Sequence, residues 1–99
     1  LDFFLINFPD AERIPLVLFW LGEISFINGD IDESLIYFLE LVSNHEDHWR
    51  APQSHKRLGD IYLSKDDKDN AKAKYNFVLK NYPNNSVSSI VLQILENME

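Results

Sequence analysis

The 99-residue sequence has no cysteine, and its net charge of −7 reflects only nine basic side chains against sixteen acidic ones. The lack of cysteine excludes disulfides and thiolate chemistry and leaves the redox compartment open. The shortage of basic residues argues against binding nucleic acid or an anionic membrane through bulk electrostatics. The longest apolar run, residues 16–21, has six residues, whereas a membrane span needs roughly 20. We therefore expect no direct membrane insertion by this sequence.

The remaining composition is that of a small folded domain. Apolar residues make up 45% of the chain, aromatic residues 13% and charged residues 25%. This mixture supports a core and excludes a disordered tail or a fibrous repeat. The chain opens at Leu1 inside an apolar segment, without Met or a signal peptide. We therefore expect a single domain over residues 1–99 that is a fragment of a longer protein.

An internal repeat organises the sequence. The tetrapeptide Leu21-Gly22-Glu23-Ile24 recurs 37 residues later as Leu58-Gly59-Asp60-Ile61. The same shift brings other residues of one kind into phase: Pro15 with Pro52, Phe38 with Tyr75, and, over two periods, Phe8-Pro9 with Tyr82-Pro83. Because a fixed period of this length indicates a repeat architecture, each period is expected to form one supersecondary unit.

Within each period the apolar spacing predicts a helix, a turn and a second helix. Apolar residues recur at three- and four-residue steps, while the alternation typical of strands is nowhere sustained. Asn28-Gly29 interrupts the first period, and Asp30 with Glu33 predicts a capping box. The sequence thus predicts an all-α fold with helices over about 1–8, 12–28, 31–44, 50–64, 67–81 and 85–98, the last capped by an asparagine.

This arrangement resembles the tetratricopeptide repeat. The Leu-Gly pairs fall at its paired positions, Ser34 and Ala71 at its small-residue position, and Phe38 and Tyr75 at its aromatic position. The resemblance implies an α-solenoid of two helical hairpins, at about 15–48 and 52–85, flanked by a partial N-terminal helix and a C-terminal capping helix at about 85–98. Gly22 and Gly59 are expected to leave room where the two helices of each hairpin approach closely.

A narrower resemblance rests on the residues that lead into the first repeat and on the motif within its first helix. Phe4-Leu5, Phe8-Pro9-Asp10 and Trp20-Leu21-Gly22-Glu23 resemble the repeat domain of the Tol–Pal-associated cell-division coordinator of bacterial envelopes, and the repeats of the outer-membrane-assembly lipoprotein are similar. His45-Glu46 and Ser25 depart from that pattern. The resemblance implies a non-enzymatic protein, periplasmic or associated with the cell envelope, that binds an envelope protein such as TolA. A cytoplasmic location is the alternative.

On the repeat template, the first helix of each hairpin lines the concave side and supplies the partner-binding residues. These predicted residues are Leu16, Phe19, Glu23, Phe26 and Ile27 in the first repeat, and Gln53, Lys56, Asp60 and Leu63 in the second. An alternative is that Phe19 and Phe26 only pack under a neighbouring helix. Glu23 and Asp60 stand where a carboxylate clamp needs asparagine, so binding of a partner's C-terminal carboxylate is not expected.

The first half of the chain differs from the second in charge and in apolar content. Residues 1–48 carry ten acidic and one basic side chain, whereas residues 49–80 carry eight basic and four acidic ones. The lysines of the second half are expected to solvate an outer helix face. Residues 1–20 are apolar on more than one side, which predicts a homodimer through this segment.

The sequence offers little for catalysis or cofactor binding. His45-Glu46-Asp47-His48 is not the His-Glu-x-x-His zinc motif, so we expect no metal and assign these histidines to solvated or capping roles. No phosphate loop or serine-nucleophile frame is present, and Trp20 and Trp49 are expected to pack. We therefore predict no enzyme and no cofactor, but a protein-binding scaffold. The alternatives are a structural or self-assembling spacer and a regulatory domain of a larger enzyme.

Overall fold

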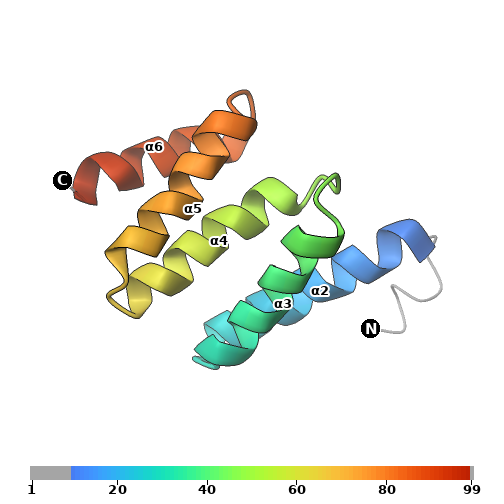
Figure 1. The fold of residues 1–99 in the computed structure, drawn as a ribbon. Coiled ribbons are helices and arrows are strands. Elements are labelled where there is room, and N and C mark those ends of the chain that lie inside the picture. The colour runs from blue at the N-terminus through green and yellow to red at the C-terminus, as the bar shows by residue number, and fades with distance from the viewer. Residues whose placement is uncertain (1–9, 99) are drawn as a thin grey trace. The chain divides into compact units, whose positions relative to one another are not determined.

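The computed structural model describes residues 10–98, which form five α-helices joined by short turns (Figure 1). They are α2 (Asp10–Ile27), α3 (Ile31–Asn44), α4 (Ala51–Ser64), α5 (Lys68–Asn81) and α6 (Ser86–Met98). No strand occurs among these residues, so the predicted all-α class is confirmed, with helix ends within two residues of those expected. The helix predicted at residues 1–8 lies outside the described part of the chain.

The chain divides into two compact units whose boundary falls between Ala51 and Pro52. This is the beginning of the second predicted repeat. The first unit contains the α2–α3 hairpin, and the second contains α5, α6 and nearly all of α4. A single domain over residues 1–99 stays a prediction.

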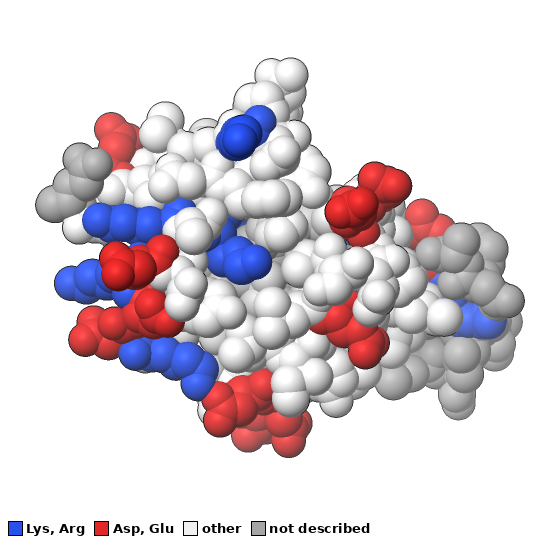
Figure 2. Space-filling model, viewed as in Figure 1, with Lys and Arg blue, Asp and Glu red and all other residues white. Residues whose placement is uncertain are grey.

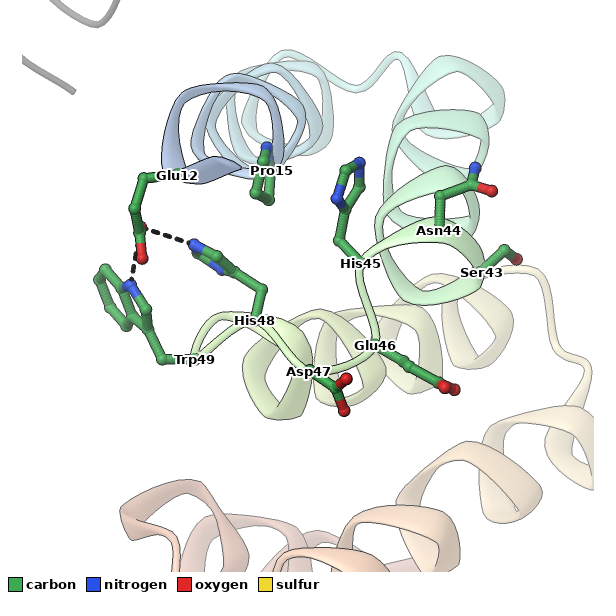
Figure 3. Close-up of a pocket in the computed structure, with 9 residues that line it drawn as sticks. All are labelled: Glu12, Pro15, Ser43, Asn44, His45, Glu46, Asp47, His48 and Trp49. Carbon is green, nitrogen blue, oxygen red and sulfur yellow. Dashed lines mark hydrogen bonds and ion pairs between the residues drawn. The ribbon is translucent and has the colours of Figure 1, made fainter. Parts of the chain in front are cut away.

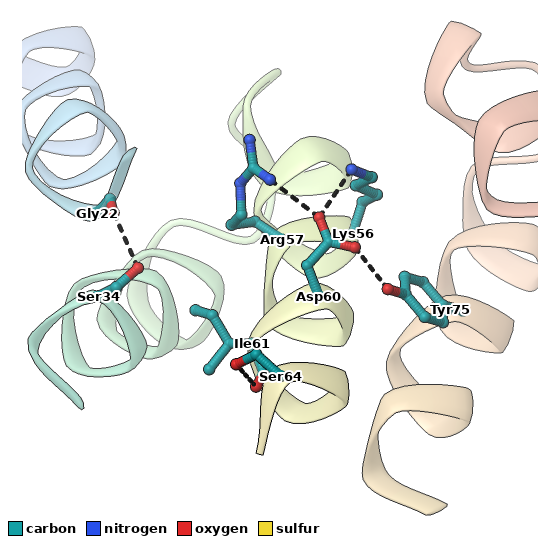
Figure 4. Close-up of polar contacts among 8 residues, drawn as sticks. All are labelled: Gly22, Ser34, Lys56, Arg57, Asp60, Ile61, Ser64 and Tyr75. Atoms are coloured by element: carbon teal, nitrogen blue, oxygen red, sulfur yellow. Dashed lines mark hydrogen bonds and ion pairs between the residues drawn. The ribbon is translucent and has the colours of Figure 1, made fainter. Parts of the chain in front are cut away.

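In the first unit, α2 and α3 pack tightly at Gly22. A Cβ atom added to Gly22 would lie 2.7 Å from two carbon atoms of the Phe38 ring, which is itself fully buried. Beside this contact, the Oγ of buried Ser34 donates a 2.8 Å hydrogen bond to the Gly22 carbonyl (Figure 4). Small residues on both helices therefore permit the close packing, as the sequence predicted.

The second unit repeats this contact 37 residues later. A Cβ atom on Gly59 would overlap the Tyr75 ring, with two of its carbon atoms at 2.7 Å and a third closer still. Helix α6 covers the other side of α5, and together they form a core of buried residues: Ala71, Tyr75, Val78, Val87 and Val91. The Asn85 side chain accepts a 3.0 Å hydrogen bond from the Val87 N–H, so the predicted asparagine cap of α6 is confirmed.

The two hairpin turns have the same backbone hydrogen bond but different residues at the left-handed position. Gly29 (φ +85°) occupies it in the first unit and Asp66 (φ +61°) in the second. The next amide donates to a carbonyl five residues back in both, at 2.8 Å for Asp30 and 2.9 Å for Asp67.

The predicted capping box at Asp30 is wrong. Asp30 precedes α3, but its side chain makes no capping hydrogen bond. In the second unit, Asp67 accepts from both the backbone N–H and the side-chain amide of Asn70, at 3.3 and 2.7 Å. The residue in the place of Asn70 is Glu33, whose carboxylate cannot donate to Asp30 and repels it. In addition, the Asp30 N–H already donates to the Ser25 carbonyl at 2.8 Å, so it is not available to the Glu33 side chain of a capping box.

Candidate partner-binding site

Two of the predicted partner-binding residues on α2 belong to the core. Leu16 is only 3% exposed and Phe19 only 5%. The Phe19 ring packs edge-to-face on Phe38 of the same hairpin, with 5.9 Å between ring centroids. The prediction is therefore wrong for Leu16 and Phe19, because their side chains fill the hairpin and offer no surface to a partner.

The other predicted residues of α2 lie at or near the surface. Glu23 and Phe26 are half-buried, while Ile27, at the end of the helix, is 76% exposed. An isoleucine with this exposure has no core role, so the accessible part of the predicted site on α2 is its C-terminal half.

On α4, all four predicted residues are half-buried and follow one another at three- or four-residue steps: Gln53, Lys56, Asp60 and Leu63. Asp60 is the centre of a polar cluster on this helix (Figure 4). Its Oδ2 accepts from Lys56 Nζ at 2.7 Å and from Arg57 at 3.0 Å, while its Oδ1 accepts from the Tyr75 hydroxyl at 2.5 Å. The structure thus joins Lys56 and Asp60 to Arg57 and Tyr75, neither of which the sequence analysis assigned to the partner-binding site.

This cluster gives Asp60 a structural role as well as a surface charge. Burial and the neighbouring Asp60 carboxylate raise the pKa of Tyr75 well above its usual value, so its hydroxyl stays a neutral donor. Lys56 and Arg57 thus share one oxygen of the Asp60 carboxylate, which holds the three side chains together on α4. The spacing of Lys56 and Arg57 before Asp60, at i,i+4 and i,i+3, is the sequence signal that points to these ion pairs.

In the first unit, Phe19 and Trp20 stand 37 residues before Lys56 and Arg57, at the equivalent positions of the repeat. The cation beside them is Arg50, which lies in the segment after α3. The Arg50 guanidinium carbon lies 4.4 Å from the Phe19 ring centroid, 5.5 Å from that of Trp20 and 4.4 Å from that of Trp49. Burial lowers the pKa of Arg50, and the charge of Glu23 opposes this effect. An arginine enclosed by three aromatic rings is a strong cation–π arrangement that fixes the segment after α3.

A pocket of about 560 Å³ lies where this segment passes the first turns of α2 (Figure 3). His48 accepts a 3.1 Å hydrogen bond from the Arg50 N–H through Nδ1, so its Nε2 carries the proton and donates to Glu12 at 2.9 Å. The Trp49 indole N–H donates to the same carboxylate oxygen at 3.2 Å. These two donors hold the pKa of Glu12 below its usual value. The sequence analysis did not predict this site.

Residues 57–85 match the tetratricopeptide repeat family. The matched segment contains Gly59, Tyr75 and Pro83, and it covers most of α4 and all of α5. No curated protein matches the chain. The general resemblance stated from the sequence is thus confirmed for the second repeat, whereas the narrower resemblance to the Tol–Pal-associated coordinator receives no support.

Tetratricopeptide repeats generally mediate protein–protein interaction and are typically non-catalytic. In the described part of the chain, no group of three or more His, Asp or Glu side chains is arranged to hold a metal ion. Among the helices of residues 10–98, none is long and apolar enough to cross a membrane.

The lysines around the α4–α5 turn are mixed with acidic residues. Lys65, Lys68 and Lys72 alternate along the chain with Asp66, Asp67 and Asp69. Figure 2 shows basic and acidic side chains interleaved around the α4–α5 turn. Such a surface suits solvation of an outer helix face and offers no continuous field for a polyanion.

Proposed function

We propose that this chain is a non-catalytic protein-interaction module that contacts a partner protein through the first helix of each hairpin. The tetratricopeptide match at residues 57–85 carries this proposal. On α2, the contact residues are Glu23, Phe26 and Ile27, and on α4 they are Gln53, Lys56, Asp60 and Leu63. The α2 residues offer apolar contact beside one carboxylate, while the α4 residues offer the polar cluster around Asp60.

Photo-crosslinking tests this surface directly. Benzoylphenylalanine is placed at Phe26 on α2 or at Leu63 on α4, and in matched controls at Ile36 on α3 or Phe77 on α5. Both controls are exposed apolar residues on the second helix of a hairpin. On irradiation in the cells that produce the protein, we expect one discrete protein adduct from the first pair and none from the controls. Adducts from the controls alone, or from all four positions equally, would contradict the proposed surface.

We also propose that the partner belongs to a bacterial cell envelope and that the module works in the periplasm or at the envelope. The sequence motif before and within α2, which ends in Trp20-Leu21-Gly22-Glu23 and resembles repeats of envelope proteins, supports this proposal. Fractionation of the producing cells checks it. Recovery of the protein with the periplasmic or envelope fraction is expected, and recovery with the cytoplasmic fraction would favour the alternative.

A second candidate function is self-association, which one feature of α2 favours. One side of this helix carries exposed apolar residues at three- and four-residue steps: Trp20, Ile24 and Ile27. Part of the segment predicted to dimerise, residues 1–9, lies outside the described residues. An exposed apolar helix side of this kind is typical of interaction surfaces.

Light scattering with a charged variant tests self-association. We expect the chain to be at least partly dimeric at high concentration and the double variant Ile24→Glu, Ile27→Glu to be monomeric. The matched control, Ile36→Glu with Ile90→Glu, places the same charges at exposed isoleucines of α3 and α6 and should stay dimeric. A wild-type chain that is monomeric at every concentration rules this candidate out.

A further inference from the structure

The pocket at the end of α3 is a separate feature from the helix surfaces proposed above. At about 560 Å³ it falls within the size range of ligand pockets. Its walls come from the first turns of α2, the last turn of α3 and the turn that follows (Figure 3), and they include Glu12, Ser43, Glu46, Asp47, His48 and Trp49.

The electrostatics of this pocket favour a cation. The C-terminal end of α3 carries the negative end of the helix dipole, and no basic residue lies in its last turn. Glu46 and Asp47, both exposed, are among the lining residues, and so is Glu12, whose carboxylate also accepts from His48 and Trp49. No lysine or arginine is among the residues that line the pocket; the nearby Arg50 guanidinium lies over the rings of Phe19, Trp20 and Trp49.

The second hairpin has a basic residue at the equivalent helix end. Helix α5 has Lys80 in its last turn, where a cation interacts favourably with the helix dipole. The residue 37 positions earlier, at the end of α3, is Ser43. One hairpin therefore supplies its own cation at this place, and the other has a neutral residue beside an acidic pocket.

Trp49 gives the pocket a rigid apolar wall. Its indole N–H is held by Glu12, its ring stacks on His48 with 5.4 Å between centroids, and the Arg50 guanidinium lies over it. The side chain is nevertheless 56% exposed, contrary to the packing role expected from the sequence. A fixed and exposed tryptophan beside a pocket is typical of residues that dominate a protein interface.

A metal ion is a poor fit for this cation site. His48 uses Nδ1 to accept from Arg50 and Nε2 to donate to Glu12, so neither ring nitrogen is available as a ligand. An organic cation on an apolar stem fits better, because the stem packs on an aromatic ring while the charged group stays near the rim.

We propose that this pocket binds the side chain of a lysine or arginine from a partner protein, with its charged group at the α3 end and its stem against Trp49. The inference rests on the proposed function only in assigning this side chain to a protein. The pocket is a contact additional to the α2 and α4 surfaces, so it can be tested without the partner.

Small probes titrated into the ¹⁵N-labelled chain test the pocket by NMR. The cationic probes are N-acetyl-arginine amide and N-acetyl-lysine amide, which also separate the two side chains. The neutral controls are the amides of N-acetyl-citrulline and N-acetyl-norleucine. We expect saturable shifts of the Trp49 indole N–H and of the amides of residues 43–49 with a cationic probe, and none with the neutral probes. Equal shifts with norleucine, or no saturable shift with either cation, would overturn the proposal.

Two variants locate the charge that binds the probe. The pair Glu46→Gln, Asp47→Asn should weaken probe binding about fivefold. The matched pair Asp32→Asn, Glu33→Gln removes two exposed carboxylates from the first turn of α3 and should have no comparable effect. Equal weakening by both pairs would mean general attraction to an acidic surface and would overturn the proposal.

A third variant copies the second hairpin. Ser43→Lys places a tethered lysine at the position equivalent to Lys80 and should compete with the probes, whereas Ser89→Lys, at an exposed serine of α6, should not. Unchanged probe binding in Ser43→Lys counts against the site. If the probes bind but the photo-crosslinks fail, the pocket stands without the proposed function, and the reverse result removes the pocket alone.

Discussion

His55 is a titratable side chain buried in the second unit without a full set of hydrogen bonds. Its ring stacks on Phe77 with 4.2 Å between centroids, and its Nδ1 has no hydrogen-bond partner among the described residues. Burial, assisted by the charge of Lys74, lowers the pKa of His55 to about 4. The residue at the same position of the first repeat is the buried Leu18, which shows that a purely apolar side chain suits this place.

The depressed pKa of His55 predicts how stability depends on pH. The unfolded chain, with a histidine pKa near its ordinary value of about 6.5, binds the proton more readily than the folded chain. The free energy of unfolding therefore has its full value, as far as His55 is concerned, above about pH 6.5. It falls by about 2 kcal/mol as the pH drops towards 4. Urea unfolding from pH 7 to pH 4 measures this slope. We expect His55→Leu to reduce the change of the free energy of unfolding with pH. The control His45→Gln, at a half-exposed histidine, should not alter this change. An unchanged pH dependence in His55→Leu would contradict the explanation.

At the scale of helices, the glycine–aromatic contact explains why each pair packs so closely. The Tyr75 ring cannot move away from α4 easily, because it is fully buried and its hydroxyl is held by Asp60. We therefore expect Gly59→Ala to destabilise the chain by about 1–3 kcal/mol through overpacking, despite the better helix propensity of alanine.

The measurement for Gly59→Ala is thermal or urea unfolding followed by circular dichroism. The control is Ser64→Ala, at an exposed position of the same helix, which should change stability little. Gly22→Ala should behave like Gly59→Ala, because its Cβ meets the Phe38 ring in the same way. Wild-type stability in both glycine variants would show that the hairpins pack more loosely than the structure indicates.

The helices and their closest contacts could be predicted because their signals are local or periodic. The three- and four-residue spacing gives the helix bounds, and the 37-residue period places Gly22 and Gly59 in equivalent surroundings. The Arg50 site and the pocket depend on side chains from distant parts of the sequence, such as Glu12 and His48, which are 36 residues apart. No periodic pattern encodes such a pair. Likewise, the template placed Phe19 on the surface because it does not record which rings meet inside a hairpin.

At the scale of the whole molecule, the division into two compact units predicts that a core defect in one unit has its main effect there. Val91 of α6 is fully buried against α5 in the second unit. Replacing it with alanine removes apolar contacts and leaves a cavity, at a cost of about 2 kcal/mol. Since local opening is governed by the packing of the region that opens, amide exchange should accelerate more in α4–α6 than in α2–α3.

Hydrogen-exchange mass spectrometry measures this effect segment by segment. Leu92→Ala changes a half-exposed side chain one residue further along α6 and is the matched control, for which we expect little acceleration in any helix. Acceleration confined to α4–α6 in Val91→Ala means that each hairpin keeps its own core, so a partner bound to one unit can leave the other's stability unchanged. Equal acceleration in all five described helices would instead mean that the units unfold as one body, and binding at either would then stabilise both.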